Sequence, residues 1–378
     1  MNTPVFVCGR RTVFGKAFKG CFKDVRPDDL AVELLRSYQT SANDLWNRQP
    51  QDLIAGCAYP EGEQGYNVAR TIALGCGLDT PGLTINRLCA SSLEAVAIAA
   101  SRVKAGWGTR FLVAGVESMS RIPRRGSNFS ESDLIKGTNP QTYTPNGTTA
   151  EKVANQYPEI SRQIQEDFAA RSHELADAAY NAGNYSKQLH SLGADRDEFI
   201  RVPVDREKMA SLTPAFDENG VVTAATSSPL TDGATSGWVV DTETAKSCGI
   251  NSGLEIIDAT IAHVQPDVMG MGPVPATKLI FERNSVDASN IDAFEINEAF
   301  AIQVLASMQE LNIPLEKTNA WGGAMALGHP LGASGLRLLM TLHDRLALAD
   351  KEGALGLATL CVGGGQGMSV LCRYVTFG

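Results

Sequence analysis

Two cysteines and one histidine lie in sequence contexts that could support covalent chemistry. Cys89 lies between a short apolar run and a helical segment, Cys361 opens the segment CVGGGQG, and His329 lies in the bend WGGAMALGHPLGASG. Cysteine is a strong nucleophile, and histidine is the side chain that most often moves protons near neutral pH. Together they suit covalent acyl transfer with proton transfer, whereas a lone cysteine is more often a small buried hydrophobe.

The position of Cys89 favours a nucleophile. The preceding run, with Leu83, Ile85 and Leu88, is typical of a short buried strand. Apolar residues then recur at helical spacing, namely Leu93, Val96, Ala97, Ala100 and Val103. Unpaired N–H groups and the positive end of the dipole at a helix start favour a thiolate. Such a turn can lower a cysteine pKa from about 8.5 into the range of roughly 3.5 to 7.5.

Further polar groups follow predicted strands. Asn297 and Glu298 lie in EINEAFA, directly after a buried strand. The glycines after Cys361 allow backbone N–H groups to approach a ligand closely. The uncharged run 353–372 is therefore interpreted as strand (355–362), glycine turn and strand (368–375), which is a hairpin of a soluble core rather than a membrane span.

Composition and charge exclude several classes of function. The 378 residues carry a net charge of -9, which argues against a nucleic-acid partner and requires a local basic patch for any anionic ligand. The eight cysteines and five histidines form no zinc motif, so we expect no metal. Neither a signal peptide nor a peroxisomal address is recognisable, and the free thiols fit a reducing, cytoplasmic location.

The remaining pattern predicts alternating strands and helices. We expect strands at 5–8, 52–57 and 111–115, helices at 28–38, 65–74 and 162–182, and a loop over 10–20. A helix and a strand follow within 278–296, and a helix over 336–346. This alternation predicts βαβ units and a mostly parallel sheet.

The second half of the chain repeats the first in weak outline. CASSL at Cys89 matches GASGL at Gly332, and Asp52 matches Asp292 at nearly the same offset. This indicates a duplicated α/β domain, although Ala- and Ser-rich helix starts also match by chance. We expect an N-terminal half formed by 1–118 and 217–248, an inserted loop subdomain at 119–216, and a C-terminal half at 249–378.

The insertion begins with a basic segment. Its cations outnumber its carboxylates. The cations are Arg121, Arg124, Arg125 and Lys136, and the carboxylates are Glu131 and Asp133. A solvated loop or a subunit contact is the simplest interpretation of such a cluster.

Long motifs in the right order make the chain similar to the thiolase family. They are RRTVFGK, EQGYNVAR, NRLCASSLEA, GVESMSR, DGAT, MGPVPA, INEAFA, GGAMALGHPLGASG and CVGGGQG. The resemblance implies an α/β fold with two similar halves in a five-layer αβαβα arrangement. It also implies that the inserted subdomain covers a coenzyme A site.

The resemblance implies roles for five residues. Cys89 is similar to the nucleophile that becomes acylated, and His329 to the base that takes its proton. Cys361 is similar to the residue that moves a proton to and from the α-carbon of the acetyl unit. Asn297 would hold a water that stabilises the thioester enolate together with His329. The N–H groups of Cys89 and Gly363 would form a second oxyanion hole.

It also implies contacts with coenzyme A. Ser228 resembles a pantetheine contact, Met269 an acyl-pocket methionine, and Ala299 with Phe300 the apolar wall beside it. Arg201 would contact adenine or phosphate, unless it is a surface arginine without a role.

The sequence departs from the short-chain members at two places. Thr144, Pro145 and Asn146 stand where those members have Tyr-His-Met, and the segment between Arg121 and Gly147 is shorter than usual, which predicts a more open acyl pocket. The resemblance therefore does not imply a preference for acetoacetyl-CoA. Trp321 stands in place of the second asparagine of an N-x-N-G-G motif.

The implied function is thiolysis of 3-ketoacyl-CoA by free CoA, or condensation of two acetyl-CoA, through an acyl-Cys89 thioester. Coenzyme A would be a substrate rather than a permanently bound cofactor, and the enzyme would be a homodimer or homotetramer. Two alternatives remain open at this point, namely a non-catalytic acyl-CoA or lipid carrier with this fold, and a condensing enzyme of the ketoacyl-synthase type.

Overall fold

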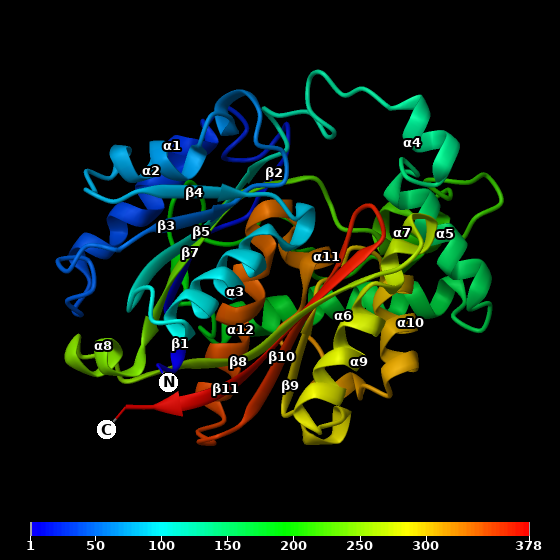
Figure 1. Cartoon of the computed structure of the whole chain (residues 1–378). Coiled ribbons are helices and arrows are strands. Elements are labelled where there is room, and N and C mark those ends of the chain that lie inside the picture. The colour runs from blue at the N-terminus through cyan, green and yellow to red at the C-terminus, as the bar shows by residue number, and fades with distance from the viewer. Residues whose placement is uncertain (1, 378) are drawn as a thin grey trace.

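The computed structural model describes residues 2–377, which form a layered α/β protein built on one mixed sheet (Figure 1). The strands follow the order β4-β3-β5-β7-β1-β8-β11-β10-β9, with β2 paired to β7 and β6 to β1. They are β1 (Pro4–Thr12), β2 (Gly15–Lys16), β3 (Leu53–Gly56), β4 (Gly82–Ile85), β5 (Arg110–Ser118), β6 (Leu189–His190), β7 (Thr231–Asp241), β8 (Ser252–His263), β9 (Ala293–Ile296), β10 (Leu355–Val362) and β11 (Gln366–Thr376).

The expectation of a mostly parallel sheet was wrong. Parallel pairing is confined to β3 with β4 and β5, to β9 with β10, and to the short β1–β6 pair. The central strands β7, β1, β8 and β11 pair antiparallel, as do β5 with β7 and β10 with β11. Strand–helix alternation predicted the βαβ units correctly, but a glycine turn joins β10 to β11 without a crossover helix, and such a connection makes antiparallel neighbours.

The sheet consists of two similar halves. Strands β1 and β8 share only the register pairs Val5↔Glu255 and Phe6↔Leu254, so the sheet is weakly joined there. On one side the order is β1-β7-β5-β3-β4, and on the other it is β8-β11-β10-β9, followed by a parallel bridge from Phe294 to Thr318. The same order of elements on both sides confirms the duplication predicted from sequence.

Helices cover both outer faces and fill the space between the halves. They are α1 (Pro27–Arg36), α2 (Val68–Gly75), α3 (Ser91–Lys104), α4 (Asp133–Thr138), α5 (Asn146–Gln156), α6 (Arg162–Asn181), α7 (Arg206–Ser211), α8 (Thr242–Ser247), α9 (Pro273–Asn284), α10 (Ala301–Leu311), α11 (Ala324–Leu327) and α12 (Ser334–Leu348).

Three hydrophobic cores define five layers. The first core packs α1 and α2 on the N-terminal strands, and the third packs α9 and α10 on the C-terminal strands. The middle core holds α3 and α12 between residues of both half-sheets, and Figure 1 shows these two helices at the centre of the molecule. The five-layer αβαβα arrangement implied by the family resemblance is therefore present.

The inserted segment lies against the opposite half of the molecule. Helix α5 contacts α10 and the 3₁₀ segment η5 (Pro266–Met271), and α6 contacts α10 and α11. Figure 1 shows α4 to α7 grouped beside α9 and α10. A chain segment that leaves the N-terminal half thus covers the elements that carry His329 and Asn297.

Two local expectations need correction. Residues 10–20 were expected to form a loop, but β1 extends to Thr12 and β2 follows at Gly15. The strand was missed because an arginine is usually a surface residue. Arg11 is instead fully buried, and its guanidinium forms an ion pair with Asp197 at 2.8 Å. Strand β4 was expected to be buried but is only partly so, because it lies at the edge of the sheet.

The central helices touch the sheets and each other at glycines. A Cβ at Gly335 would lie 2.5 Å from the backbone nitrogen of Leu93, and one at Gly115 would lie 2.7 Å from the Cα of Ala333. The absence of side chains at these positions brings the N-terminal ends of α3 and α12 together.

Replacing Gly335 by alanine is expected to lower the free energy of unfolding by about 1–3 kcal/mol, because the new methyl group would meet backbone atoms that cannot rotate away. Denaturant unfolding measures this loss. Gly137→Ala is the matched control, since a Cβ there meets nothing within 4 Å and lies in a helix. Equal stability of the two variants would contradict the tight contact.

Candidate active site

Cys89 lies at the strand-to-helix turn predicted from sequence. Strand β4 ends at Ile85, the 3₁₀ segment η3 (Leu88–Ala90) follows, and α3 begins at Ser91. Leu88 has a φ of 45°, in the left-handed region that bulky residues rarely adopt. The backbone just before the nucleophile is therefore strained, as is common at functional sites.

The expected lowering of the Cys89 pKa is wrong. Burial raises the pKa of Cys89 to about 12, because it removes water from a thiolate and the carboxyl group of Glu117 lies nearby. The N–H groups of Gly363 and of Cys89 itself oppose this rise but do not cancel it. Cys89 is therefore a neutral thiol that needs a base, while two backbone donors already face its sulfur.

Cys361 and Gly363 reach Cys89 from the other half of the molecule. Cys361 is fully buried at the end of β10, and its pKa is raised by burial and by the proximity of Cys89. The turn to β11 contains Gly364 and Gly365, both with φ near 80°, which glycine adopts without strain. This turn holds the Gly363 N–H beside the Cys89 sulfur.

His329 lies in the bend between α11 and the 3₁₀ segment η8 (Leu331–Ala333). Its Nδ1 lies 2.6 Å from the hydroxyl of Ser334, and that hydroxyl donates to the carbonyl of Pro330 at 2.9 Å. A hydroxyl has one proton to donate, so Ser334 accepts from Nδ1–H. The other nitrogen, Nε2, then carries no proton and accepts from the side-chain amide nitrogen of Asn297 at 3.3 Å.

The environment keeps His329 uncharged. Burial lowers the pKa of His329 to about 3, with the positive charge of Arg337 as a second cause. A histidine with this pKa is a neutral imidazole throughout the physiological pH range. Such an imidazole holds no proton at rest on Nε2. It can act as a general base, which takes a proton from a neighbouring group during the reaction step.

The Ser334 hydroxyl fixes which nitrogen of His329 is basic, so Ser334→Ala is expected to lower kcat by about 10- to 100-fold, with a smaller change in KM. Ser307→Ala is the control, because it also removes a buried hydroxyl from a helix, and that hydroxyl makes no hydrogen bond. Steady-state kinetics would contradict the role of Ser334 if both variants lost the same activity.

Two buried carboxylates brace these segments. Glu117 accepts from the N–H of Ala58 at 2.8 Å, from Gln64 at 2.7 Å and from the N–H of Gly332 at 2.9 Å. It therefore ties β5 of the first half to the bend that follows His329. Glu298 accepts from Ser172, Asn319 and the N–H of Met325, which ties the insertion to the same bend.

A cavity of about 210 Å³ opens at the nucleophile and is here called the Cys89 cavity. Residues of five segments line it, namely Tyr59, Leu88, Cys89, Arg125, Phe129, Thr142, Tyr143, Thr144, Asn146, Leu331, Gly363 and Gly364. Thr144 and Asn146, two of the residues that replace Tyr-His-Met, thus face the space beside the sulfur. Leu331 connects this cavity to the bend that carries His329.

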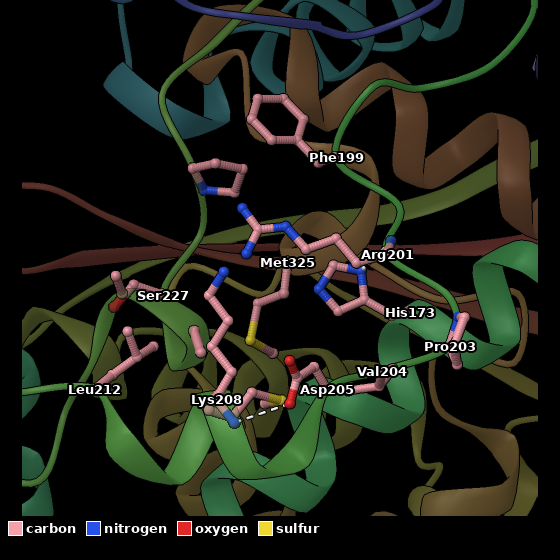
Figure 2. A pocket seen from close by; sticks show the side chains of 14 residues that line it. His173, Phe199, Arg201, Pro203, Val204, Asp205, Lys208, Leu212, Ser227 and Met325 are labelled. Carbon is pink, nitrogen blue, oxygen red and sulfur yellow. Dashed lines mark hydrogen bonds between the residues drawn. The ribbon is translucent and has the colours of Figure 1, made fainter.

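A second cavity, of about 400 Å³, lies between the insertion and the core and is here called the Arg201 cavity (Figure 2). His173, Arg201 and Lys208 come from the insertion, and Ser227 and Met325 come from the core. Met325 precedes His329 in the same bend, and Leu331 follows it. The bend therefore touches the Arg201 cavity on one side and the Cys89 cavity on the other.

The structure places the remaining predicted contacts around these cavities. Arg201 lines the Arg201 cavity, whereas Ser228 lies between two lining residues and donates its N–H to Ala299 at 2.9 Å. Met269, Ala299 and Phe300 are buried together in the third core and line neither cavity.

Trp321 supports the insertion. Its ring packs edge to face on Tyr185 with centroids 5.8 Å apart, and the Tyr185 hydroxyl donates to its carbonyl. It thereby joins the segment before α11 to the end of the insertion.

Within residues 2–377, no group of three or more His, Cys, Asp or Glu side chains is arranged to hold a metal ion. In the same range, no helix is both long and apolar enough to cross a membrane.

Comparison with known proteins identifies the family. Residues 5–243 match the family description "Thiolase, N-terminal domain", and residues 252–374 match "Thiolase, C-terminal domain". The chain therefore belongs to the thiolase family. It is a thiolase and hence an acyltransferase.

Relatives of the chain match it along their whole length. The 3-ketoacyl-CoA thiolase of Shewanella loihica is 38% identical, with 98% of this chain and 99% of that protein covered. The 3-ketoacyl-CoA thiolase of Bacillus subtilis is 36% identical, with 97% of this chain and 98% of that protein covered. The crystal structure of the dimeric peroxisomal thiolase of Saccharomyces cerevisiae has a TM-score of 0.91 and 31% identity, covering 100% of this chain and 98% of that one.

Sequence reasoning missed several residues of the site. Ser334 was seen only as part of a helix start, although a serine five positions after a histidine in a glycine-rich bend can reach back to its ring. Glu117 was quoted within a motif but given no role. Tyr59 carries no local signal, and Arg125 was interpreted only as part of a solvated basic segment, because only the tertiary fold brings the two residues to the Cys89 cavity.

Proposed function

We propose that the protein catalyses reversible thiolysis of 3-ketoacyl-CoA by free CoA through an acyl group carried on Cys89. The observations that support this most are a neutral buried thiol faced by two N–H donors and, in the bend next to the same cavity, a neutral imidazole whose Nε2 carries no proton. Neither a structural cysteine nor a structural histidine needs this arrangement.

In the first half-reaction, Nε2 of His329 takes the proton of the Cys89 thiol, and the sulfur attacks the keto carbon of the substrate. The N–H groups of Cys89 and Gly363 stabilise the oxyanion that forms, each contributing about 3 kcal/mol. The bond between C2 and C3 then breaks. Asn297, through a water, and His329 stabilise the resulting enolate, and Cys361 protonates its carbon to release acetyl-CoA.

In the second half-reaction, the thiol of CoA gives its proton to the Cys361 thiolate and its sulfur attacks the acyl-Cys89 thioester. Cys89 leaves as a thiolate and recovers its proton from His329. Both cysteines and the histidine return to their starting states, so the same steps in reverse condense two acetyl-CoA molecules. Each proton has a donor and an acceptor among the three residues and the substrates.

The Arg201 cavity is the proposed site of coenzyme A, which acts as a substrate and not as a permanently bound cofactor. Arg201 and Lys208 supply positive charge for phosphates in a protein whose net charge is -9. Pantetheine would then run toward Met325 and Ser227. Ser228, Met269, Ala299 and Phe300 would support this channel from behind rather than contact the ligand.

We further propose that the enzyme is a cytoplasmic homo-oligomer, and that its basic unit is a dimer like the yeast thiolase. A surface of suitable character lies over α3, where Trp107 is 77% exposed beside Ile261, which is 42% exposed. Two copies that bury such a surface would remove this apolar area from water.

Intact-protein mass spectrometry tests the proposed chemistry. The enzyme is mixed, without free CoA, with acetoacetyl-CoA and separately with 3-oxo-octanoyl-CoA. An acyl adduct that free CoA removes is expected, and an enzyme without an adduct that still binds CoA would support the non-catalytic carrier. Turnover with acyl-carrier-protein substrates but not with CoA substrates would support the ketoacyl-synthase alternative.

A further inference from the structure

We propose that the acyl chain bound at Cys89 ends in a carboxylate, so that the preferred substrates are CoA thioesters of 3-keto dicarboxylic acids rather than of 3-keto fatty acids. This inference rests on the proposed function and adds the chemistry of the far end of the chain. It is drawn from the lining of the Cys89 cavity.

The Cys89 cavity has a mixed lining that carries one kind of charge. Among the described residues that line it, Arg125 is the single charged side chain, and no carboxylate lines it. Hydroxyl or amide groups come from five further lining residues, which are Tyr59, Thr142, Tyr143, Thr144 and Asn146. Thr142 and Tyr143 already have protein partners, but a methyl-ended chain would remove water from the Arg125 guanidinium without pairing it, which is costly. A terminal carboxylate would pair with it.

Arg125 is held in position and shares its nearest carboxylate with Lys136. Its Nη2 donates to the carbonyl of Tyr143 at 2.7 Å, and its guanidinium lies 5.0 Å from the centre of the Phe129 ring. The nearest carboxylate, Glu131, is 3.6 Å from Nη1, while its other oxygen accepts from Lys136 at 3.2 Å. The planar guanidinium thus keeps donor capacity, and it matches a carboxylate in a two-point contact.

Tyr59 connects this arginine to the nucleophile. The pKa of Tyr59 is raised by burial and by the proximity of Cys89, and it is lowered by the Arg125 backbone N–H and by the Arg124 charge. Tyr59 thus lines the same cavity as Cys89 and Arg125, and its phenol accepts from the Arg125 backbone N–H. A chain that starts on Cys89 and follows the Tyr59 side of the cavity ends near Arg125.

The other cations of the basic segment do not line the Cys89 cavity. Arg121 forms an ion pair with Glu63 through two nitrogens, and Lys136 pairs with Glu131. These exposed pairs fit the solvated loop predicted for the segment as a whole. Arg125 is the exception, because it lines the cavity at the nucleophile while the phosphates of coenzyme A are assigned to the Arg201 cavity.

The test compares two substrates of equal chain length, 3-oxohexanoyl-CoA and the mono-CoA thioester of 3-oxohexanedioic acid. The wild-type enzyme is expected to have the higher kcat/KM for thiolysis of the dicarboxylic compound. Arg125→Met is expected to lower the ratio of the two kcat/KM values by about 10- to 100-fold, because a charge-assisted contact is lost. A site built to pair a polar group discriminates strongly against an analogue that lacks it.

Arg124→Met is the matched control, since it removes the same charge from the neighbouring residue, which does not line the cavity. Its ratio should stay within about twofold of the wild-type ratio. Arg125→Lys should give an intermediate ratio, because the charge remains but the planar fork is lost. A melting temperature for each variant shows whether the loop still folds.

Three results would overturn the inference. They are a wild-type preference for the methyl-ended substrate, equal ratios for Arg125→Met and Arg124→Met, and turnover of the methyl-ended substrate alone. In each of these cases the proposed thiolase function still stands. Absence of turnover with both substrates, together with absence of an adduct on Cys89, would instead overturn the proposed function and this inference with it.

Discussion

Cys89→Ala is expected to abolish thiolysis, with a loss of about 10⁴-fold or more in kcat, because no other group can carry the acyl chain between the two half-reactions. Alanine fits the site without strain, since Cys89 is 6% exposed and packs as a small side chain. Coenzyme A binding at the Arg201 cavity should therefore persist. Steady-state kinetics, a binding titration with CoA and the mass of the acylated protein measure these three quantities.

Cys76→Ala is the control for the loss of a thiol. Cys76 is also 6% exposed but lies at the end of α2, away from the Cys89 cavity. This variant should keep its acyl adduct and its turnover. Full activity in Cys89→Ala, or an adduct that survives there, would assign the acyl group to another residue and would remove the basis of the proposed mechanism.

His329→Ala is expected to lower kcat by about 10²- to 10⁴-fold, the usual contribution of a positioned general base. The loss should occur in adduct formation, because the Cys89 thiol has a pKa of about 12 and does not ionise by itself at neutral pH. Rapid-mixing measurement of acylation without free CoA isolates this step. His343→Gln is the control, because it removes an imidazole further along α12.

The pH profile of the same step carries a second expectation. Because burial lowers the pKa of His329 to about 3, this base stays unprotonated as the pH falls through 6.5. The acylation rate should thus remain level between about pH 5 and pH 9 and decline only toward the pKa of His329. A decline centred near pH 6.5 that disappears in His329→Ala would show that the histidine is not kept neutral by burial.

Local sequence signals predicted those parts of the fold that depend on neighbours in the chain. The strand-to-helix turn at Cys89 and the hairpin around the GGGQG segment were predicted correctly, because apolar periodicity and glycines define them directly. The antiparallel centre of the sheet was not, since the pairing of β1 with β7 and β8 joins segments far apart in sequence. Arg11 likewise looked like a loop residue because its partner Asp197 belongs to the insertion.

In the candidate site, too, local motifs predicted some features, whereas others depend on the whole fold. The motifs identified Cys89, His329 and Cys361, and the fold brings Cys361 beside Cys89 and Asn297 beside His329. The direction of the Cys89 pKa shift was wrong, because a helix start is a local feature whereas burial depends on the whole fold. Arg125 could not be assigned to the cavity from its sequence neighbourhood, which is rich in other cations.

The duplicated architecture has a consequence for the number of acyl groups that one chain can carry in the proposed mechanism. In the two matching helix starts, Cys89 in η3 corresponds to Gly332 in η8, so the second copy lacks a nucleophile at the equivalent point. A side chain could not return there, because a Cβ at Gly332 would lie 2.8 Å from the Cα of Cys57 and 2.9 Å from Glu117. The two halves thus supply different parts of one candidate site, and the proposed mechanism gives each chain one acyl group at a time.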